Sequence, residues 1–155
     1  FTSSIKSNAR MRMDEEDPGG AAYHALGDIY IRFGFYDKAL QVYENGIENN
    51  DIDSRPLKPA RLYQGKGVAL LKAHKFAEAA QAFKKALELD GGMYTAVFNL
   101  AVANMALNNT EAAVNGFNEF TQRADATQDE ARIIAAQGFI QQINEKADAA
   151  KEGEK

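Results

Sequence analysis

Two side chains with metal-binding potential, His24 and Asp28, are four residues apart and therefore share one face of a helix. Arg32 follows one helical turn later. A structural zinc site needs four ligands, yet His74 is distant in the sequence and cysteine is absent. We therefore expect a solvated helix face on which the Asp28 carboxylate pairs with Arg32, and we predict no metal site.

The sequence also lacks the compact motifs of metalloproteases, serine hydrolases and nucleotide-binding proteins. The dipeptide Gly19-Gly20 after Pro18 indicates a loop at the start of a helix, because a phosphate cradle needs a longer glycine pattern. The acidic run at residues 14–17 is interpreted as a solvated linker, with a calcium-like cluster as the alternative. We expect no enzyme activity and no cofactor.

Composition narrows the classes of partner. The 155 residues carry 18 Lys and Arg against 22 Asp and Glu, a formal net charge of -4 that argues against nucleic acid. No run of about 18 apolar residues is present, so we predict no membrane span within the chain. Because the sequence begins at Phe1, we expect that an upstream signal peptide, anchor or domain was removed, which leaves the cellular compartment open.

An internal repeat determines the predicted fold. Residues 23–47, 63–87 and 97–121 share one pattern of small and large side chains, and each copy predicts a pair of amphipathic helices. Small residues stand where the two helices of a pair approach, and an aromatic ring follows four residues after the second of them. The small pairs are Gly27 and Ala39, Gly67 and Ala79, and Ala101 and Ala113, and the rings are Tyr43, Phe83 and Phe117. The turn positions are Gly34, His74 and Asn108, residue types that tolerate left-handed backbone.

The segments around the repeats have their own signals. Residues 50–59 form an insertion with two prolines, of which Pro59 can open the next helix. Thr127 and Glu130 predict a capping box before a closing helix. The expected apolar face of that helix consists of Ile133, Ala136, Ile140 and Ile143. We predict a segment at 1–19, a repeat domain at 20–147 with copies at 20–53, 60–93 and 94–127, a closing helix at 128–146, and a charged, disordered tail at 148–155. Ile5, Met11 and Met13 suggest a short helix that packs on the first hairpin or enters a neighbour's groove.

The repeat resembles a known family. The first copy is similar to the tetratricopeptide repeat in Tyr23, Leu26, Gly27, Tyr30, Gly34, Ala39, Tyr43 and Gly46, and the second in Gly67, Leu70, Ala79, Phe83 and Ala86. The chain departs from the family pattern at Lys66, which replaces an apolar residue. The resemblance implies an all-α, right-handed superhelical stack of antiparallel helix hairpins whose first helices line a concave groove for an extended peptide or a helix.

By this resemblance the chain is a protein interaction module, an adaptor or assembly scaffold. The implied partner-binding residues are His24, Asp28, Arg32, Arg61, Gln64, Val68, Leu71, Lys72, Phe98, Asn99, Val102 and Met105. The same surface includes Ala21, Ala25, Ile31, Gly65, Thr95 and Ala106. Its excess of basic groups predicts a partner with an apolar stripe and some acidic residues.

Three alternatives bear on this hypothesis. Phe98, Val102 and Met105 either form a partner surface or pack beneath the closing helix. Family members that clamp the acidic tails of heat-shock chaperones use Lys, Asn and Arg at positions that hold His24, Asp28, Gly65, Thr95 and Asn99 in this chain, so we do not expect chaperone-tail binding. The second functional hypothesis is a self-associating scaffold that forms homo-oligomers.

Overall fold

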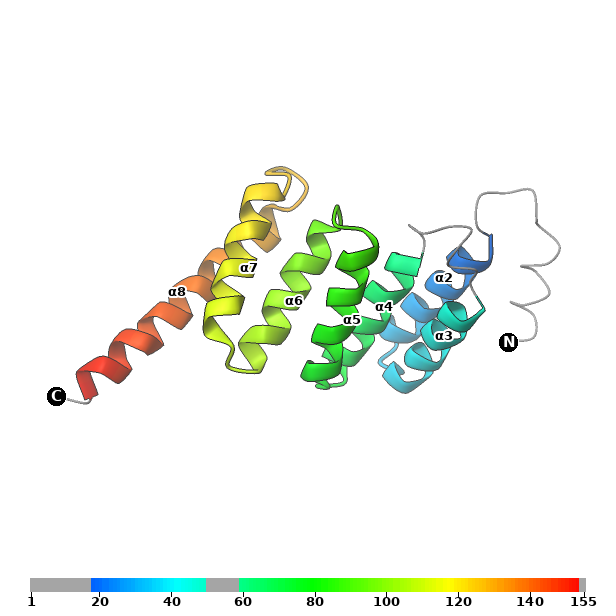
Figure 1. Ribbon diagram of the computed structural model, residues 1–155, viewed down its shortest axis with the longest axis horizontal. Helices are drawn as coiled ribbons and strands as arrows, with labels where there is room; N and C mark the ends of the chain where they lie inside the picture. The colour runs from blue at the N-terminus through cyan, green and yellow to red at the C-terminus, as the bar shows by residue number, and fades with distance from the viewer. Residues whose placement is uncertain (1–17, 50–58, 154–155) are drawn as a thin grey trace. The chain divides into compact units, whose positions relative to one another are not determined.

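A computed structural model describes residues 18–49 and 59–153 of the chain, and these residues form α-helices without any strand (Figure 1). The helices are α2 (Pro18–Arg32), α3 (Tyr36–Glu48), α4 (Pro59–Lys72), α5 (Phe76–Leu89), α6 (Tyr94–Ala106), α7 (Thr110–Arg123) and α8 (Glu130–Gly153). The predicted all-α class is confirmed, and the three predicted hairpins correspond to α2–α3, α4–α5 and α6–α7.

The chain divides into two compact units. Unit 1 covers Phe1–Gly92 and contains α2 to α5, and unit 2 covers Met93–Lys155 and contains α6 to α8. In unit 1 the two hairpins stack, because α4 packs against both α3 and α2. In unit 2 the closing helix α8 packs against α7.

Unit 1 is held together by aromatic rings that sit against glycines. Tyr43 of α3 and Phe83 of α5 are fully buried, as the repeat pattern predicts. A Cβ atom added to Gly67 would lie 2.6 Å from the Phe83 ring, and one added to Gly27 would lie 2.7 Å from the Tyr43 Cε atoms and closer still to Cζ. The small positions are therefore needed because a ring from the second helix occupies the space beside the first helix.

Unit 2 has an aromatic core. Phe117 and Phe120 of α7 are fully buried, and Phe98 of α6 contacts both, with ring centroids 5.6 Å and 5.0 Å away. Phe139 of α8 lies 5.3 Å from Phe117. The closing helix thus covers the ring that the repeat pattern places in the hairpin core, as expected for a terminal helix of a repeat stack.

The three hairpin turns use left-handed backbone, as predicted. Gly34, His74 and Asn108 have φ angles of 76°, 60° and 59°. Asn and His tolerate this region better than most residues with a Cβ atom, and glycine adopts it at no steric cost. Helix α4 begins at Pro59, which confirms the predicted proline start.

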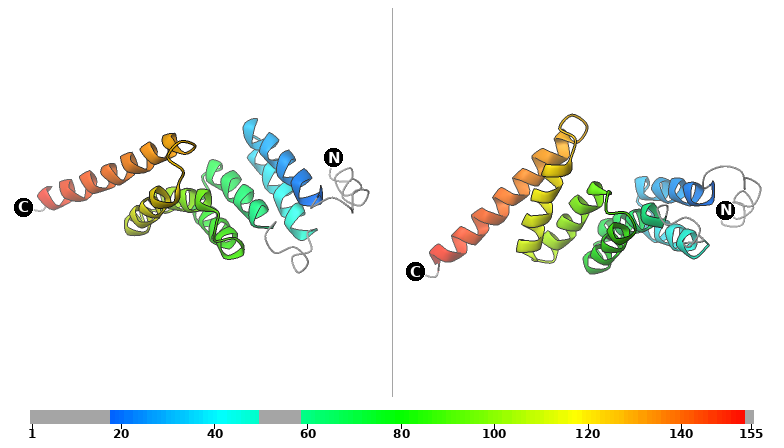
Figure 2. Two further views of the ribbon diagram at one scale, coloured as in Figure 1. Left: turned by 90° about the horizontal axis from the view of Figure 1, so that it is seen from above. Right: turned by 45° about the horizontal axis from the view of Figure 1, so that its top comes forward.

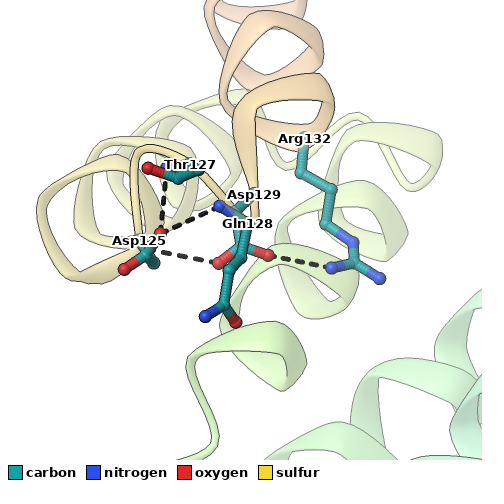
Figure 3. Close-up of polar contacts among 5 residues, drawn as sticks. All are labelled: Asp125, Thr127, Gln128, Asp129 and Arg132. Carbon is teal, nitrogen blue, oxygen red and sulfur yellow. Dashed lines mark hydrogen bonds and ion pairs between the residues drawn. The ribbon is translucent and has the colours of Figure 1, made fainter.

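The capping box predicted for α8 is wrong, because the helix begins at Glu130 rather than near Thr127. Two aspartates organise this junction (Figure 3). The Asp125 carboxylate accepts hydrogen bonds from the backbone N–H groups of Thr127 and Gln128, both at 2.9 Å. Asp129 accepts from the backbone N–H of Asp125 at 3.2 Å. The Asp125 carboxylate therefore satisfies the Thr127 N–H, which Glu130 would satisfy in a Thr–Glu box.

Helix α8 continues to Gly153, so the charged tail expected from residue 148 is helical through that residue. Figure 2 shows its C-terminal half extending away from α7. Residues 144–153 are all exposed. Alanine, glutamate and lysine have high intrinsic helix propensity, which favours helix here without a packing surface. The structure does not describe residues 1–17 and 50–58. The predictions for Ile5, Met11 and Met13, for the acidic run and for the proline insertion fall on these residues.

Candidate functional site

A cavity of about 400 Å³ lies between the first helices of the two hairpins of unit 1. It is lined by four residues of α2 and four residues of α4. These are His24, Asp28, Ile31, Arg32, Arg61, Gln64, Gly65 and Val68. All eight are on the surface that the family resemblance assigns to the groove, and six belong to the predicted partner-binding set. The structure brings these six together, while their role in binding stays a prediction.

The Asp28 carboxylate has two protein partners in this cavity. The Tyr43 hydroxyl donates a hydrogen bond to Oδ1 at 2.6 Å, and His24 Nδ1 lies 3.2 Å from Oδ2. Burial, followed by the hydrogen bond and the negative charge of Asp28, raises the pKa of Tyr43, so the phenol stays protonated and acts as a donor. The predicted pairing of Asp28 with Arg32 is wrong: the Asp28 carboxylate contacts His24 and Tyr43, and it forms no ion pair with Arg32.

Gly65 leaves room for the Tyr43 ring of α3, whose hydroxyl reaches Asp28 at the cavity. A Cβ atom at Gly65 would lie 2.9 Å from the Tyr43 hydroxyl oxygen and even closer to the ring. Only glycine leaves room for the ring at this point of α4. The sequence pattern identifies Tyr43 as a core ring and does not indicate that its hydroxyl reaches Asp28. A signal that could have indicated this contact is Gly65, a glycine in the interior of α4.

Two arginines of the cavity carry free positive charge. Arg32 and Arg61 are exposed, and neither has an ion-pair partner within the part of the chain that the structure describes. Lys66, by contrast, pairs with Glu44 across α3 and α4 at 3.1 Å, which accounts for the departure from the family pattern at that position. Of the other two predicted residues on α4, Leu71 is half-buried and Lys72 is exposed, and neither lines the cavity.

The predicted partner-binding residues of unit 2 are on α6. Phe98 is half-buried and contacts the rings of α7, so at least its ring takes part in the core of the unit. Asn99, Val102 and Met105 are also half-buried. Their role in binding stays a prediction.

In unit 2 the Asp129 carboxylate lies directly before α8, and its environment differs from that of Asp28. Burial alone would raise its pKa, but hydrogen bonds from the Tyr94 hydroxyl, Arg132 and the backbone of Asp125 together lower the pKa. Arg132 Nη1 lies 2.9 Å from Asp129 Oδ1. These contacts join the start of α6 to the start of α8 and are a structural link.

Other kinds of site were sought across residues 18–49 and 59–153. No group of three or more His, Cys, Asp or Glu side chains in these ranges is placed to hold a metal ion. None of the helices described there is both long and apolar enough to cross a bilayer.

Two family models match the chain, and both describe the tetratricopeptide repeat. One matches residues 20–52 and the other residues 70–138, which together are more than half of the chain. The chain is a tetratricopeptide repeat protein. The first match covers α3 and all of α2 except its first two residues, and the second match contains α5, α6 and α7.

Solved tetratricopeptide structures share the fold. The first tetratricopeptide domain of Spaghetti (RPAP3), bound to an HSP90 peptide, is 20% identical with a TM-score of 0.70, covering 87% of this chain and 98% of that one. PcrH of Pseudomonas aeruginosa, in complex with the chaperone-binding region of PopD, is 19% identical with a TM-score of 0.71, covering 86% and 97%. A T3SS complex from Aeromonas hydrophila is 17% identical with a TM-score of 0.73, covering 94% and 95%. No curated protein matches the sequence of this tetratricopeptide protein.

Proposed function

We propose that this protein is a protein interaction module that holds a segment of another polypeptide in the cavity between α2 and α4. The observation that carries the proposal is the cavity itself, about 400 Å³ in volume and lined from both hairpins of unit 1. The similar structures of the Spaghetti domain and PcrH contain a bound peptide and a bound region of a partner, which supports an adaptor or scaffold role.

The lining suggests the chemistry of the segment. Ile31 and Val68 offer apolar contacts, and Arg32 and Arg61 offer guanidinium groups that form no ion pair with any residue that the structure describes. The contacts of the Asp28 carboxylate are with His24 and Tyr43 rather than with these arginines. A segment with an apolar stripe flanked by acidic residues would satisfy both features, since guanidinium groups bind carboxylates in bidentate geometry.

The same geometry argues against a chaperone tail as the ligand, although one similar structure contains an HSP90 peptide. A terminal carboxylate bound at the centre of the cavity would face the Asp28 carboxylate, which Tyr43 holds in place. Like charges at such a distance repel and are weakly screened inside a cleft. We therefore propose that the ligand is an internal segment of its partner rather than a carboxyl-terminal tail.

The experiment compares two charge reversals of equal size. The variant Arg32→Glu/Arg61→Glu changes the cavity, and Lys84→Glu/Lys146→Glu changes two exposed lysines of α5 and α8 by the same net charge. The wild type and both variants are each used to capture proteins from the native host. The proteins of interest are those that bind the wild type and the control variant but not the cavity variant. Their binding segment is then mapped by peptide arrays and its affinity measured by calorimetry.

We expect the cavity variant to weaken this binding by about tenfold or more, because hydrogen bonds to charged groups contribute about 1.5–3 kcal/mol each. Equal binding by the cavity variant and the control would reject the cavity as the site. A mapped segment that binds only through its free carboxyl terminus would reject the internal-segment proposal while leaving the interaction role intact.

The remaining predicted residues are part of the same proposal in a weaker form. Leu71 and Lys72 of α4 in unit 1, and Asn99, Val102 and Met105 of α6 in unit 2, are predicted binding residues that do not line the cavity. Their substitution tests whether they also contribute to partner binding. The self-associating alternative is tested by light scattering over a wide concentration range, where a strict monomer rejects it.

A further inference from the structure

The turn between α2 and α3 exposes large apolar side chains. Phe33 is 73% exposed, Phe35 is 53% exposed, and Ile29, one turn before Phe33 on α2, is 48% exposed. We call these three residues the aromatic tip. Gly34, between the two phenylalanines, has open space around it, since a Cβ atom added there would meet no atom within 4 Å. The tip is therefore an open, projecting turn rather than part of a packed surface.

The repeat provides an internal comparison for the two phenylalanines. The turn position of Phe33 holds Ala73 in the second hairpin, and that of Phe35 holds Lys75. The fold of the turn is nevertheless the same, with a left-handed residue at Gly34 and at His74. Since the turn forms without rings at these positions, the two phenylalanines are not required by the hairpin geometry.

Basic side chains lie in or next to the two hairpin turns of unit 1. Figure 1 shows that the α2–α3 and α4–α5 turns are at the same end of unit 1. This end carries four exposed cations, namely Arg32, Lys38, Lys72 and Lys75. The carboxylates in the first turns of α3 and α5 are Asp37 and Glu78. An excess of positive charge is thus concentrated here in a chain whose formal net charge is -4.

One of these cations, Lys38, lies over the aromatic rings of Tyr30 and Phe35. Lys38 Nζ lies 5.1 Å from the centroid of the Phe35 ring and 5.8 Å from that of the Tyr30 ring. Tyr30 and Phe35 in turn contact each other edge to face at 6.4 Å. The arrangement places a positive charge directly beside an exposed apolar side chain, with both at the same tip.

We propose that the aromatic tip and its surrounding cations form a peripheral docking site for an anionic lipid bilayer. Phe33, Phe35 and Ile29 enter the boundary between headgroups and acyl chains, and the four cations bind the anionic headgroups. Apolar side chains combined with Lys and Arg are the pattern of interfacial membrane binding. A bilayer is favoured over an acidic protein because the rings project from an open turn, and a protein would need a pocket shaped to receive both.

This site is separate from the proposed function, since the cavity between α2 and α4 shares only Arg32 with it. The two proposals can therefore fail independently. A protein that binds vesicles at the tip need not bind a peptide in the cavity, and the reverse also holds.

The absence of tryptophan from the sequence makes a direct reporter possible. Phe33→Trp places a single tryptophan at the tip, and Leu107→Trp places one at the equivalent turn position of the third hairpin, where the side chain is 36% exposed. The full chain is mixed with vesicles of equimolar phosphatidylglycerol and phosphatidylcholine, and with vesicles of phosphatidylcholine alone. We expect a blue shift of the Phe33→Trp emission with the anionic vesicles only, and no shift for Leu107→Trp.

Binding without a reporter is measured by co-sedimentation with the same vesicles. Phe33→Ser/Phe35→Ser is expected to lower the vesicle affinity about tenfold or more, because two apolar rings no longer enter the interface. Lys38→Glu/Lys75→Glu is expected to do the same, since each basic residue near an anionic surface contributes about fivefold. Leu107→Ser is the matched control and should bind like the wild type. Circular dichroism melts check that each variant is folded.

Several results would overturn the proposal. These are no shift and no sedimentation with anionic vesicles, equal binding to both kinds of vesicle, or equal shifts of the two reporters. A Phe33→Trp shift with polyglutamate but not with vesicles would assign the tip to an acidic protein instead. Binding that persists in high salt would also contradict it, because exposed charges are screened under those conditions.

Discussion

The contact between Gly65 and Tyr43 can be tested by one methyl group. Gly65→Ala adds a Cβ atom to α4 at a point where it would lie 2.9 Å from the Tyr43 hydroxyl oxygen and closer still to the ring. Tyr43 is fully buried, so its ring has no open space into which it can move. The methyl group therefore either displaces the ring or shifts α4 against α3.

Two opposing effects set the change in stability expected for Gly65→Ala. Alanine in a helix interior is favoured over glycine by about 0.8–1 kcal/mol. Inserting a methyl group into a tightly packed site typically costs about 1–3 kcal/mol. We expect Gly65→Ala to be neutral to destabilising by up to about 2 kcal/mol. Gly138 in α8 has open space, so Gly138→Ala should show the propensity gain alone.

The assay is urea unfolding followed by circular dichroism, and the control is a double-mutant cycle with Tyr43→Leu. Leucine is shorter than tyrosine and leaves room for the methyl group at residue 65. In that background Gly65→Ala should become stabilising, which gives a coupling energy of about 1–3 kcal/mol between the two positions. The reasoning is refuted if Gly65→Ala stabilises the wild type as much as Gly138→Ala stabilises α8, or if the coupling energy is zero.

Three further predictions follow from the same structure. The Tyr23 hydroxyl is buried without a hydrogen-bond partner among the described residues, so Tyr23→Phe should leave stability unchanged or raise it, whereas Tyr43→Phe should lower it by about 1–3 kcal/mol in urea melts because the bond to Asp28 is lost. Phe117→Ala should destabilise unit 2 by about 3–5 kcal/mol, while Ile134→Ala at a 61% exposed position should change stability by less than about 0.5 kcal/mol, and equal effects would contradict the aromatic core. The pKa of Asp129 is lower in the folded state than in the unfolded state. Its contribution to stability is therefore present above the unfolded pKa of about 3.9 and is lost as pH falls through the lower folded value. The melting temperature of Asp129→Asn should thus fall less steeply below pH about 4 than that of the wild type.

The repeat pattern predicted most of the fold because packing at the helix pairs depends on residue size. Small residues at Gly27 and Gly67, and rings at Tyr43 and Phe83, recur at fixed offsets, and the structure confirms that each ring fills the space left by the glycines. The left-handed turns followed from residue type in the same way, since His74 stands where Gly34 does in the first copy.

The start and end of the closing helix were not predicted correctly. Several short polar residues precede α8, and Asp125 and Asp129 accept hydrogen bonds from backbone N–H groups of this segment, so no single cap is specified by spacing alone. The helix then continues to Gly153 because its sequence favours helix even without burial. Boundaries of this kind depend on small differences in local hydrogen bonding, which a pattern of apolar residues does not contain.

The groove was predicted as a set of positions, but not its internal bonds. The spacing of His24, Asp28 and Arg32 indicated one helix face, and on that information an ion pair of Asp28 with Arg32 was the simplest expectation. The residue that donates a hydrogen bond to Asp28, Tyr43, is on the next helix, and its ring had already been assigned to the core. A contact between different helices is not encoded in the period of either.

The bond between Tyr43 and Asp28 also links the stability of unit 1 to the chemistry of its cavity. The Tyr43 ring is packed against Gly27 and Gly65, so the position of its hydroxyl is fixed by the core, and that hydroxyl in turn orients the Asp28 carboxylate. With Asp28 occupied by Tyr43 and His24, Arg32 remains without a counter-ion on α2. The positive charge of the cavity therefore depends on a buried ring. Tyr43→Phe should lower the affinity for an acidic segment as well as the stability of unit 1. Without the Tyr43 hydroxyl, the Asp28 carboxylate can approach Arg32 on the same helix face and reduce binding of the acidic segment.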